Sequence, residues 1–456
     1  MSIETPASTR VQQTAAAAAG PRTEAAARPF VIARIDVLLM LALFVMAIVP
    51  RAAWIAYNDR PPQGLNDPSL YVILGDIMAD GHGYTRPTGE KMAYYPVGFP
   101  ATVAGLKKAG DLFGWGRSTF SIKMMNGMFG AITVLLVYGL TARMLDRRTA
   151  FAAGSLLAIF PSQVYYTGTI LSEPLFTMLF VGALLVLLWH PWNRAGMPWQ
   201  RLFLAGLLLS AATMTRAITL AFPLVLLLFW LFILESKKRA LMQTLIVLAG
   251  IAVLTVPWSI RNTLAFHTPT GTSTNLGDDL CIGNFSGATG AFLLYGKCFE
   301  GYEGLSAQQV EIRRNRDGVR IAVEDLARDP LRIPRLLERK AYWLLYTDDD
   351  GLFAAESYGN DNFIPQLRRD VLSFAANSIY YATGVIVLLG AAAFALAKDV
   401  RRAFLLATLL YVLAIPLVFF GDPRFHFPAI PFAVIIAAAT VLALWDRRHA
   451  PLVRLP

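Results

Sequence analysis

The chain alternates between long apolar stretches and short basic or polar stretches. A helix that spans a membrane needs roughly 20 predominantly apolar residues. Ten stretches approach that length: residues 35–57, 119–141, 149–165, 170–189, 201–215, 217–234, 241–260, 374–397, 403–420 and 427–445. We therefore predict an all-α polytopic membrane protein with about ten transmembrane helices.

Arg216 decides how the apolar run from residue 201 to residue 234 is divided. The run is long enough for one broken helix or for two separate helices. A charged side chain near the centre of a bilayer costs on the order of several kcal/mol, whereas the same charge at an interfacial turn is solvated. We therefore predict that the run breaks at Arg216.

The basic residues lie in short runs on alternate connections between the apolar stretches. With ten crossings, six runs fall on the same side: Arg28 and Arg34; Arg143, Arg147 and Arg148; Arg194 and Arg201; Lys237, Lys238 and Arg239; Lys398, Arg401 and Arg402; Arg447 and Arg448. Cytoplasmic connections carry an excess of lysine and arginine, so we predict that this side is the cytoplasm. Residues 1–30 lack apolar periodicity and are predicted to be a disordered cytoplasmic tail.

Two long polar stretches fall on the other side. The first outer loop covers residues 58–118, inside an N-terminal membrane module of residues 31–260. An extracytoplasmic segment, 261–373, precedes the C-terminal membrane helices, 374–456. Within this segment, residues near 306–327 have the pattern of an amphipathic helix. Glu311, Arg314 and Gly318 share one face of it, and apolar residues on another face are available for burial.

Both cysteines, Cys281 and Cys298, belong to the extracytoplasmic segment. On the cytoplasmic side they would be free thiols, whereas outside the cell a disulfide between them can form. The predicted orientation permits the disulfide, and the sequence leaves the pairing open.

The composition excludes several classes of protein. Hydrophobic residues make up 55% of the chain and charged residues only 16%. Such a chain is too apolar for a soluble domain. The net charge of +10 does not indicate nucleic-acid binding, because no basic stripe with interleaved aromatic residues occurs. The five histidines are scattered and there is no Cys-x-x-Cys pattern, so we expect neither a metal site nor a cofactor.

The first outer loop carries the most promising chemistry. Asp67 and Pro68 open a stretch in which Tyr71, Leu74 and Met78 recur at helical spacing. We predict Asp67 as the N-cap of this helix, with Pro68 at the first helical position. Asp67 either caps the helix and does nothing more, or it serves as a general base at the junction of membrane and water.

Motifs along the chain support the second interpretation. In order they are Asp67-x-x-x-Tyr71, Gly81-His-Gly-Tyr84, Tyr94-Tyr-Pro-Val-Gly-Phe-Pro100, Ser172-Glu-Pro-Leu-Phe176, Thr215-Arg216, Pro257-Trp-Ser-Ile-Arg-Asn262, Gly283-Asn284, Gly287-Ala-Thr-Gly290 and Arg424-Phe-His-Phe-Pro428. This series resembles the GT-C superfamily of membrane glycosyltransferases. Within it, the chain is similar to the bacterial protein-mannosyltransferase-like and aminoarabinose-transferase-like group, the glycosyltransferase 39/83 type. The resemblance covers nearly all of residues 35–445.

The resemblance implies an activity and a role for Asp67. In this family the donor is a sugar on a polyprenyl phosphate, the product is inverted at the anomeric carbon, and the first-loop aspartate is the proposed base. The chain departs from the family in one respect, because many relatives have an Asp-Glu pair in this loop and here Pro68 follows Asp67.

A polyprenyl phosphate leaving group needs cationic partners, and arginine binds phosphate in a bidentate manner. Arg216, Arg261 and Arg424 each lie at the outer end of a different predicted helix, so we expect them to bind the donor phosphate. The alternative for each is a residue that only marks a helix end. Glu173 either contacts the substrate or pairs with Arg216. The substrate cavity is predicted to contain Tyr71, His82, Tyr94, Tyr95, Glu173, Asn284 and His426.

The sequence therefore predicts an inverting glycosyltransferase, a hexosyl- or pentosyltransferase, in the bacterial cytoplasmic (inner) membrane. Its active site should face the periplasm or the cell exterior. The expected partners are a polyprenyl-phosphate-linked sugar, an acceptor that is a lipid, glycan or protein, and membrane lipids, with no nucleic acid. The alternative is a transporter or flippase of a lipid-linked or small substrate. A transporter should have charged residues in the middle of the membrane, whereas here they concentrate at the outer ends of the helices.

Overall fold

The computed structural model describes residues 33–294 and 296–449, and it is helical. The predicted tail, residues 1–30, lies outside the described residues. No β-strand is present in the described part, which confirms the predicted all-α class. The α-helices are α1 (Arg34–Tyr57), α2 (Asp67–Ala79), α3 (Gly98–Phe113), α4 (Thr119–Met144), α5 (Arg147–Ile159), α6 (Pro161–Tyr165), α7 (Glu173–Leu188), α8 (Trp199–Thr215), α9 (Phe222–Ile233), α10 (Lys237–Phe266), α11 (Leu276–Asn284), α12 (Gly296–Phe299), α13 (Ala307–Arg328), α14 (Ile333–Leu345), α15 (Asp350–Ala355), α16 (Gln366–Ala395), α17 (Val400–Val418) and α18 (Ile430–His449).

Ten of these helices coincide with the ten predicted spans. In the described part, six helical stretches are long and apolar enough to cross a membrane: α1, α4, α10, α16, α17 and the stretch Pro423–Asp446 that contains most of α18. The other four predicted spans correspond to the shorter helices α5, α7, α8 and α9. The structure is compatible with ten crossings, and that number stays a prediction.

The chain breaks at Arg216, as predicted. Helix α8 ends at Thr215, Arg216 is extended (φ −150°, ψ 126°), and a 3₁₀ turn, Ala217–Ala221, leads into α9. Arg216 therefore lies between two helices at the polar end of the bundle.

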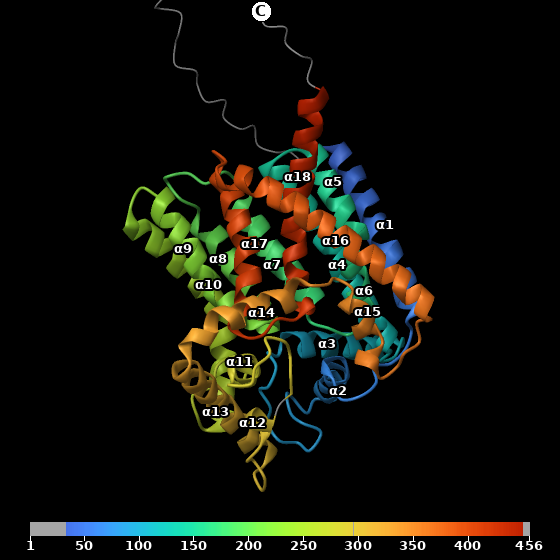
Figure 1. The fold of residues 1–456 in the computed structure, drawn as a ribbon, viewed down its shortest axis with the longest axis vertical. Coiled ribbons are helices and arrows are strands. Elements are labelled where there is room, and N and C mark those ends of the chain that lie inside the picture. The colour runs from blue at the N-terminus through green and yellow to red at the C-terminus, as the bar shows by residue number, and fades with distance from the viewer. Residues whose placement is uncertain (1–32, 295, 450–456) are drawn as a thin grey trace, which may run out of the picture.

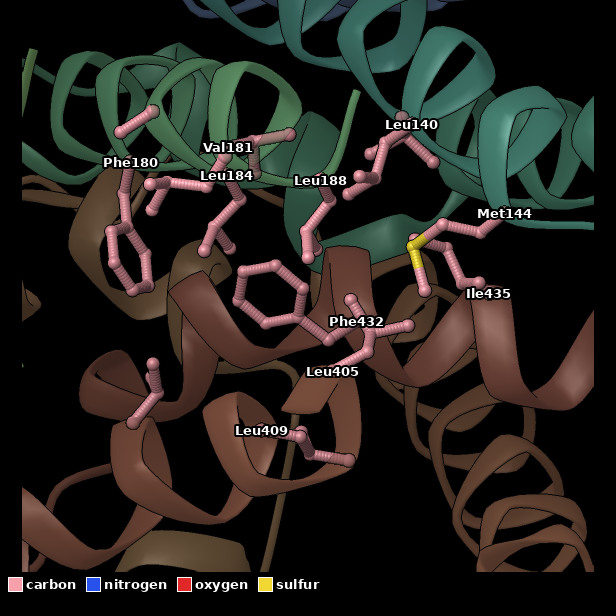
Figure 2. Close-up of a cluster of buried hydrophobic side chains, with 14 of the residues drawn as sticks. Leu140, Met144, Phe180, Val181, Leu184, Leu188, Leu405, Leu409, Phe432 and Ile435 are labelled. Atoms are coloured by element: carbon pink, nitrogen blue, oxygen red, sulfur yellow. The ribbon is translucent and has the colours of Figure 1, made fainter. Parts of the chain in front are cut away.

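The bundle is held together by a large apolar core between α4, α7, α17 and α18 (Figure 2). Its labelled residues are Leu140, Met144, Phe180, Val181, Leu184, Leu188, Leu405, Leu409, Phe432 and Ile435. Phe180 meets Phe432 edge-on, with the ring centroids 5.9 Å apart. Association of helices in lipid depends on such close packing, because the lipid is as apolar as the side chains. This core fixes where α7 begins relative to the start of α18.

The polar segments gather at one end of the bundle (Figure 1). The first outer loop contributes α2 and α3, and the extracytoplasmic segment contributes α11 to α15. The basic runs contact one another at the opposite end, where α1 begins and α18 ends. Arg147 pairs with Asp36 of α1, Arg148 pairs with Asp446 of α18, and Arg401 donates to the carbonyl of Arg143. The described basic residues Arg143, Arg147, Arg148 and Arg401 thus lie at one end, and its assignment to the cytoplasm stays a prediction.

The extracytoplasmic segment has its own small core. Cys281 and Cys298 form a disulfide that joins α11 to α12, which settles the pairing that the sequence left open. Helix α13 forms within one residue of its predicted bounds. Ile321, on the face predicted to be available for burial, is half-buried and packs against the small core, and Glu311 and Gly318 on the other face are buried as well. The reason is close packing of α13 on α11, where the backbone of Gly277 leaves no room for a side chain at position 318.

Candidate active site

Asp67 occupies a different helical position from the one predicted. The N-cap of α2 is Asn66, whose Oδ1 accepts a hydrogen bond from the backbone N–H of Ser69 at 3.2 Å. Asp67 is the first helical residue and Pro68 the second, so the predicted cap is one residue late. Since Asn66 caps the helix, the carboxylate of Asp67 can turn to other partners.

Those partners come from distant parts of the chain. Oδ2 of Asp67 lies 2.6 Å from Nη1 of Arg424, and Oδ1 accepts a 2.6 Å hydrogen bond from the hydroxyl of Tyr95. About 30% of the Asp67 side chain remains accessible. Burial raises the pKa of this carboxyl, but the charge of Arg424 and the hydrogen bonds from Tyr95 and Arg424 outweigh burial, so the pKa falls below its ordinary value. Asp67 is therefore an accessible, ionised carboxylate.

A second carboxylate links Arg424 to another arginine. Glu173, the first residue of α7, is fully buried. Its Oε1 lies 2.6 Å from Nη1 of Arg216 and also accepts a hydrogen bond from Nε of Arg424. We call the four residues Asp67, Arg424, Glu173 and Arg216 the central network. Carboxylates and guanidiniums alternate along it, and such pairing offsets the cost of burying each charge.

The structure brings together six of the predicted site residues. They are the four residues of the central network, Tyr95 and Tyr71. Tyr71 packs on Tyr95, with ring centroids 5.1 Å apart, and edge-on against Phe99 at 4.9 Å. The tyrosines thereby hold one wall of the site, and the predicted pairing of Glu173 with Arg216 is present.

Arg261 has different contacts. Its Nη1 donates to the carbonyl of Met92 and its Nη2 to the carbonyl of Tyr84, both at 2.7 Å, and its guanidinium lies 4.9 Å from the ring of Trp258. Arg261 therefore clamps the first outer loop against α10. Both terminal nitrogens of the guanidinium thus donate structural hydrogen bonds.

Three other predicted cavity residues lie apart from the central network. His82 is exposed in a turn of the first outer loop. His426 is buried between Asp348 and the carbonyl of Leu344, at 2.8 and 2.7 Å. Asn284 donates to the carbonyl of Val418, so it ties α11 to the end of α17. The remaining predicted residue, Tyr94, packs edge-on against Tyr95 and lines a separate cleft.

Asp279 is a candidate that the sequence reasoning missed. It lies in the first turns of α11, half-buried, and accepts a 2.9 Å hydrogen bond from the side chain of Asn275. Burial and the negative charges of Asp278 and Asp67 raise the pKa of Asp279 to about 7, against the opposing charges of Arg216 and Arg424. Asp67 and Asp279 thus differ in acidity, and a difference of this kind separates acid and base roles in enzymes. The adjacent pair Asp278-Asp279 was the available sequence signal.

Tyr358 is a second missed candidate. Its hydroxyl is buried and has no hydrogen-bond partner among the described residues. The charges that act on this hydroxyl are those of Arg424, Asp350, Asp67 and Glu173, and burial raises its pKa well above the ordinary value, so it stays a neutral donor. A buried donor without a partner in a polar centre is a position where a ligand can accept a hydrogen bond.

The backbone that presents Tyr358 is strained. Ser357 and Tyr358 both have positive φ, at 53° and 56°. Such values are uncommon for residues other than glycine. The turn is held against the first outer loop, since Oγ of Ser357 accepts from the backbone N–H of Gln63 at 2.9 Å. The carbonyl of Ser357 accepts from Asn66, the residue next to Asp67, at 3.4 Å. Strain that persists in this way clusters at functional sites.

Among the described residues, no three His, Cys, Asp or Glu side chains are arranged to hold a metal ion. The fold and the site together define a polytopic, all-α membrane protein with an ion-paired polar centre at one end of its bundle.

Comparison with known proteins agrees with this class. Residues 109–260, less than half of the chain, match the family model of dolichyl-phosphate-mannose-protein mannosyltransferases. The matched residues include Glu173 and Arg216 but neither Asp67 nor Arg424. No curated protein sequence is significantly similar to the chain.

Solved structures show the fold more fully. The oligosaccharyltransferase AglB of Archaeoglobus fulgidus, in complex with an inhibitory peptide and a dolichol-phosphate, has a TM-score of 0.53 at 16% identity, covering 91% of this chain and 51% of that one. The apo form of the Archaeoglobus fulgidus oligosaccharyltransferase also has a TM-score of 0.53, at 14% identity, over 90% and 51%. ArnT of Cupriavidus metallidurans, bound to undecaprenyl phosphate, is a weaker match, with a TM-score of 0.39 at 16% identity over 90% and 77%.

The chain spans about half the length of the archaeal enzymes. The chain therefore shares its fold with the oligosaccharyltransferase structures, which agrees with the resemblance to the GT-C superfamily of membrane glycosyltransferases.

Proposed function

We propose that this protein is an inverting glycosyltransferase that moves a sugar from a polyprenyl-phosphate donor to an acceptor hydroxyl, with Asp67 as the general base. The observation that carries the proposal is the central network, which holds an accessible, ionised Asp67 beside two arginines at the polar end of the bundle. The sugar is a hexose or pentose, and the site faces the periplasm or exterior of a bacterial cytoplasmic membrane.

An apolar groove next to the central network suits the donor's lipid chain. It has a volume of about 380 Å³ and is lined by Val97, Gly98, Met214, Val253, Leu254, Pro257 and Trp258. Gly98 is required there, because a Cβ atom would lie 2.5 Å from the carbonyl oxygen of Met214. Met214 is two residues before Arg216, so a polyprenyl chain in this groove would place its phosphate near that guanidinium. A dolichol-phosphate bound to the structurally similar AglB supports this class of donor.

Arg216 and Arg424 are the best candidates for the donor phosphate. Negative charge develops on the phosphate as the sugar leaves, and preorganised cations stabilise that charge. The side chain of Arg216 is 22% accessible and that of Arg424 is 12% accessible. The contacts of Arg261 with two backbone carbonyls favour a structural role for that residue.

The chemical step assigned to Asp67 is a single displacement. The acceptor oxygen forms a bond to the anomeric carbon while the bond from that carbon to the phosphate oxygen breaks, and its electron pair goes to the phosphate. The acceptor proton moves to Asp67. A base on one face of the sugar and a leaving group on the other give inversion. Asp67 and Arg216 lie at opposite ends of the central network, which suits this geometry.

The test uses the protein in lipid nanodiscs with a panel of polyprenyl-phosphate sugars and follows release of polyprenyl phosphate. We expect release from one donor class, and a loss of about 10²-fold or more in Asp67→Asn, as is typical when a general base is removed. Asp76→Asn is the matched control, because Asp76 lies on the same helix but pairs with Lys107 at 2.6 Å and is 40% accessible. Unchanged release in folded Asp67→Asn would reject the base. No release from any donor, even with cell-envelope extract as acceptor, would favour a transporter.

A further inference from the structure

A separate cleft opens between the first outer loop, α11 and α13. Its volume is about 230 Å³, and we call it the outer cleft. It is lined by Arg86, Tyr94, Asp278, Ala307, Val310, Glu311 and Arg314. None of these residues belongs to the central network.

The charges in the outer cleft are balanced. Nη2 of Arg86 lies 2.6 Å from Glu311, and Arg314 pairs with Asp278. Both carboxylates are buried, with about 1% and 2% of their side chains accessible. The Nε donor of Arg86 is buried and has no hydrogen-bond partner among the described residues. The cleft therefore presents paired acceptors and donors, with one donor unused, and no net charge.

Hydrogen bonds to Glu311 hold the walls of the cleft together. Its Oε1 accepts hydrogen bonds from the backbone N–H of Ala93 at 2.8 Å and from the hydroxyl of Thr274 at 2.6 Å. The backbone N–H of Thr274 in turn donates to the carbonyl of Ala93 at 2.9 Å. The first outer loop, α11 and α13 are thereby fixed to one another around the cleft.

Two pairs of adjacent residues separate the outer cleft from the active centre. Tyr94 lines the cleft, while the next residue, Tyr95, donates its hydroxyl hydrogen to Asp67. Asp278 likewise lines the cleft, while Asp279 experiences the charge of Asp67. The first outer loop and α11 therefore each place one residue at the cleft and the next residue towards Asp67. A saccharide held in the cleft must extend past these two segments for its terminal hydroxyl to reach Asp67.

We propose that the outer cleft binds the acceptor, and that the acceptor is an uncharged saccharide. This inference rests on the proposed glycosyltransferase function. Sugar hydroxyls are both donors and acceptors, so they match a lining in which guanidinium, carboxylate and phenol groups alternate. The ring of Tyr94 supplies an apolar surface for a sugar face.

Other acceptor classes fit the outer cleft less well. An acyl chain would meet only two aliphatic side chains, Ala307 and Val310. An anionic headgroup would find both arginines already neutralised by buried carboxylates. The cleft is smaller than the roughly 300–1,000 Å³ of typical small-molecule pockets, so it suits the end of a chain. A protein acceptor is the remaining alternative, and the test includes it.

The test fills the cleft without changing a charge. Ala307→Trp is compared with Ala307→Ser and with Val323→Trp, which places the same side chain at a 60% exposed position of α13. Transfer is measured from the polyprenyl-phosphate sugar that the wild type uses to fluorescent neutral trisaccharides and to a fluorescent peptide rich in serine and threonine. Release of polyprenyl phosphate to water is measured alongside.

We expect transfer to a trisaccharide, a KM for it raised at least tenfold in Ala307→Trp but not in Val323→Trp, and unchanged release to water in Val323→Trp. An unchanged KM in Ala307→Trp, or transfer to the peptide and to no trisaccharide, would overturn the proposal. If no donor is used by any variant, the proposed function fails and equilibrium binding of the same trisaccharides decides on the cleft. Binding that Ala307→Trp weakens tenfold supports a saccharide site, and absent or unaltered binding rejects it.

Discussion

The guanidinium of Arg424 lies 2.6 Å from the carboxylate of Asp67, although 357 residues separate them in the chain. The same guanidinium donates through Nε to the buried Glu173. A planar guanidinium can serve two carboxylates at once, which an ammonium group cannot do with the same geometry. Arg424 therefore fixes the position of both acidic residues.

Replacing Arg424 by glutamine should damage stability and activity together. Breaking a buried ion pair by removing one partner typically costs about 3–5 kcal/mol. Part of that cost falls on Glu173, which keeps Arg216 as its ion-pair partner. We expect a lower thermal unfolding temperature in detergent and loss of sugar transfer. Arg424→Lys, which retains the charge, should recover part of the stability and little of the transfer. Wild-type transfer in Arg424→Lys would contradict the double pairing.

Asp279→Asn should stabilise the protein in a manner that depends on pH. The pKa of this carboxyl rises from 3.8 to about 7 in the folded state. Well below pH 4 the group is protonated in both states and contributes nothing. As pH rises towards 7, the Asp279 carboxyl ionises in the unfolded chain before it ionises in the folded protein. The free energy of unfolding therefore falls, by on the order of 4 kcal/mol once the carboxyl is ionised in both states.

The measurement for Asp279 is thermal unfolding of the wild type and Asp279→Asn from pH 4 to pH 8. The asparagine variant should gain most at pH 8 and little near pH 4. Glu303→Gln, an exposed substitution in the same segment, serves as the control for the loss of one carboxylate. An equal effect of Asp279→Asn at both ends of the range would refute the raised pKa.

Tyr358→Phe should separate stability from activity. The variant removes a buried hydroxyl that has no partner among the described residues. Leaving such a group unsatisfied costs about 1–3 kcal/mol. Stability should hold or rise, while sugar transfer falls about tenfold because a hydrogen bond to the substrate is lost. Tyr342→Phe, at a 60% exposed tyrosine of α14, is the control. A destabilised Tyr358→Phe with normal kinetics would mean that the hydroxyl has a structural partner instead.

The disulfide should stabilise the segment that carries Asp279 and the outer cleft. The sequence separation of the two cysteines is 17 residues. Closing a loop of about that length contributes roughly 3 kcal/mol. The double variant Cys281→Ala, Cys298→Ala should show faster hydrogen exchange in α11 and α13 and little change in α4. Identical exchange in the two proteins would show that the packing of α13 on α11 suffices alone.

Features that depend on local sequence could be predicted, whereas features that depend on contacts between distant residues could not. The break at Arg216 followed from a charge inside an apolar run, which is a local signal. Motifs could name Asp67, Glu173 and Arg424 separately. Only the fold shows that Arg424 pairs with both carboxylates. The contacts of Arg261 with backbone carbonyls leave no trace in the sequence, because every residue has a carbonyl. The positive φ of Tyr358 was equally hidden, since neither Ser nor Tyr favours that conformation.

The position of Arg424 in the chain also bears on how the protein is assembled. Arg424 lies in the 3₁₀ turn, Pro423–Ala429, that leads into α18, the last helix of the described chain, whereas Glu173 belongs to α7. Chains are made from the N-terminus, so Glu173 is in place long before its second guanidinium arrives. Until the last helix docks, the negative charges of the centre exceed the positive ones there. A chain that stops before this helix leaves that negative charge unbalanced inside the bundle, and the helix that completes the bundle also neutralises the central network.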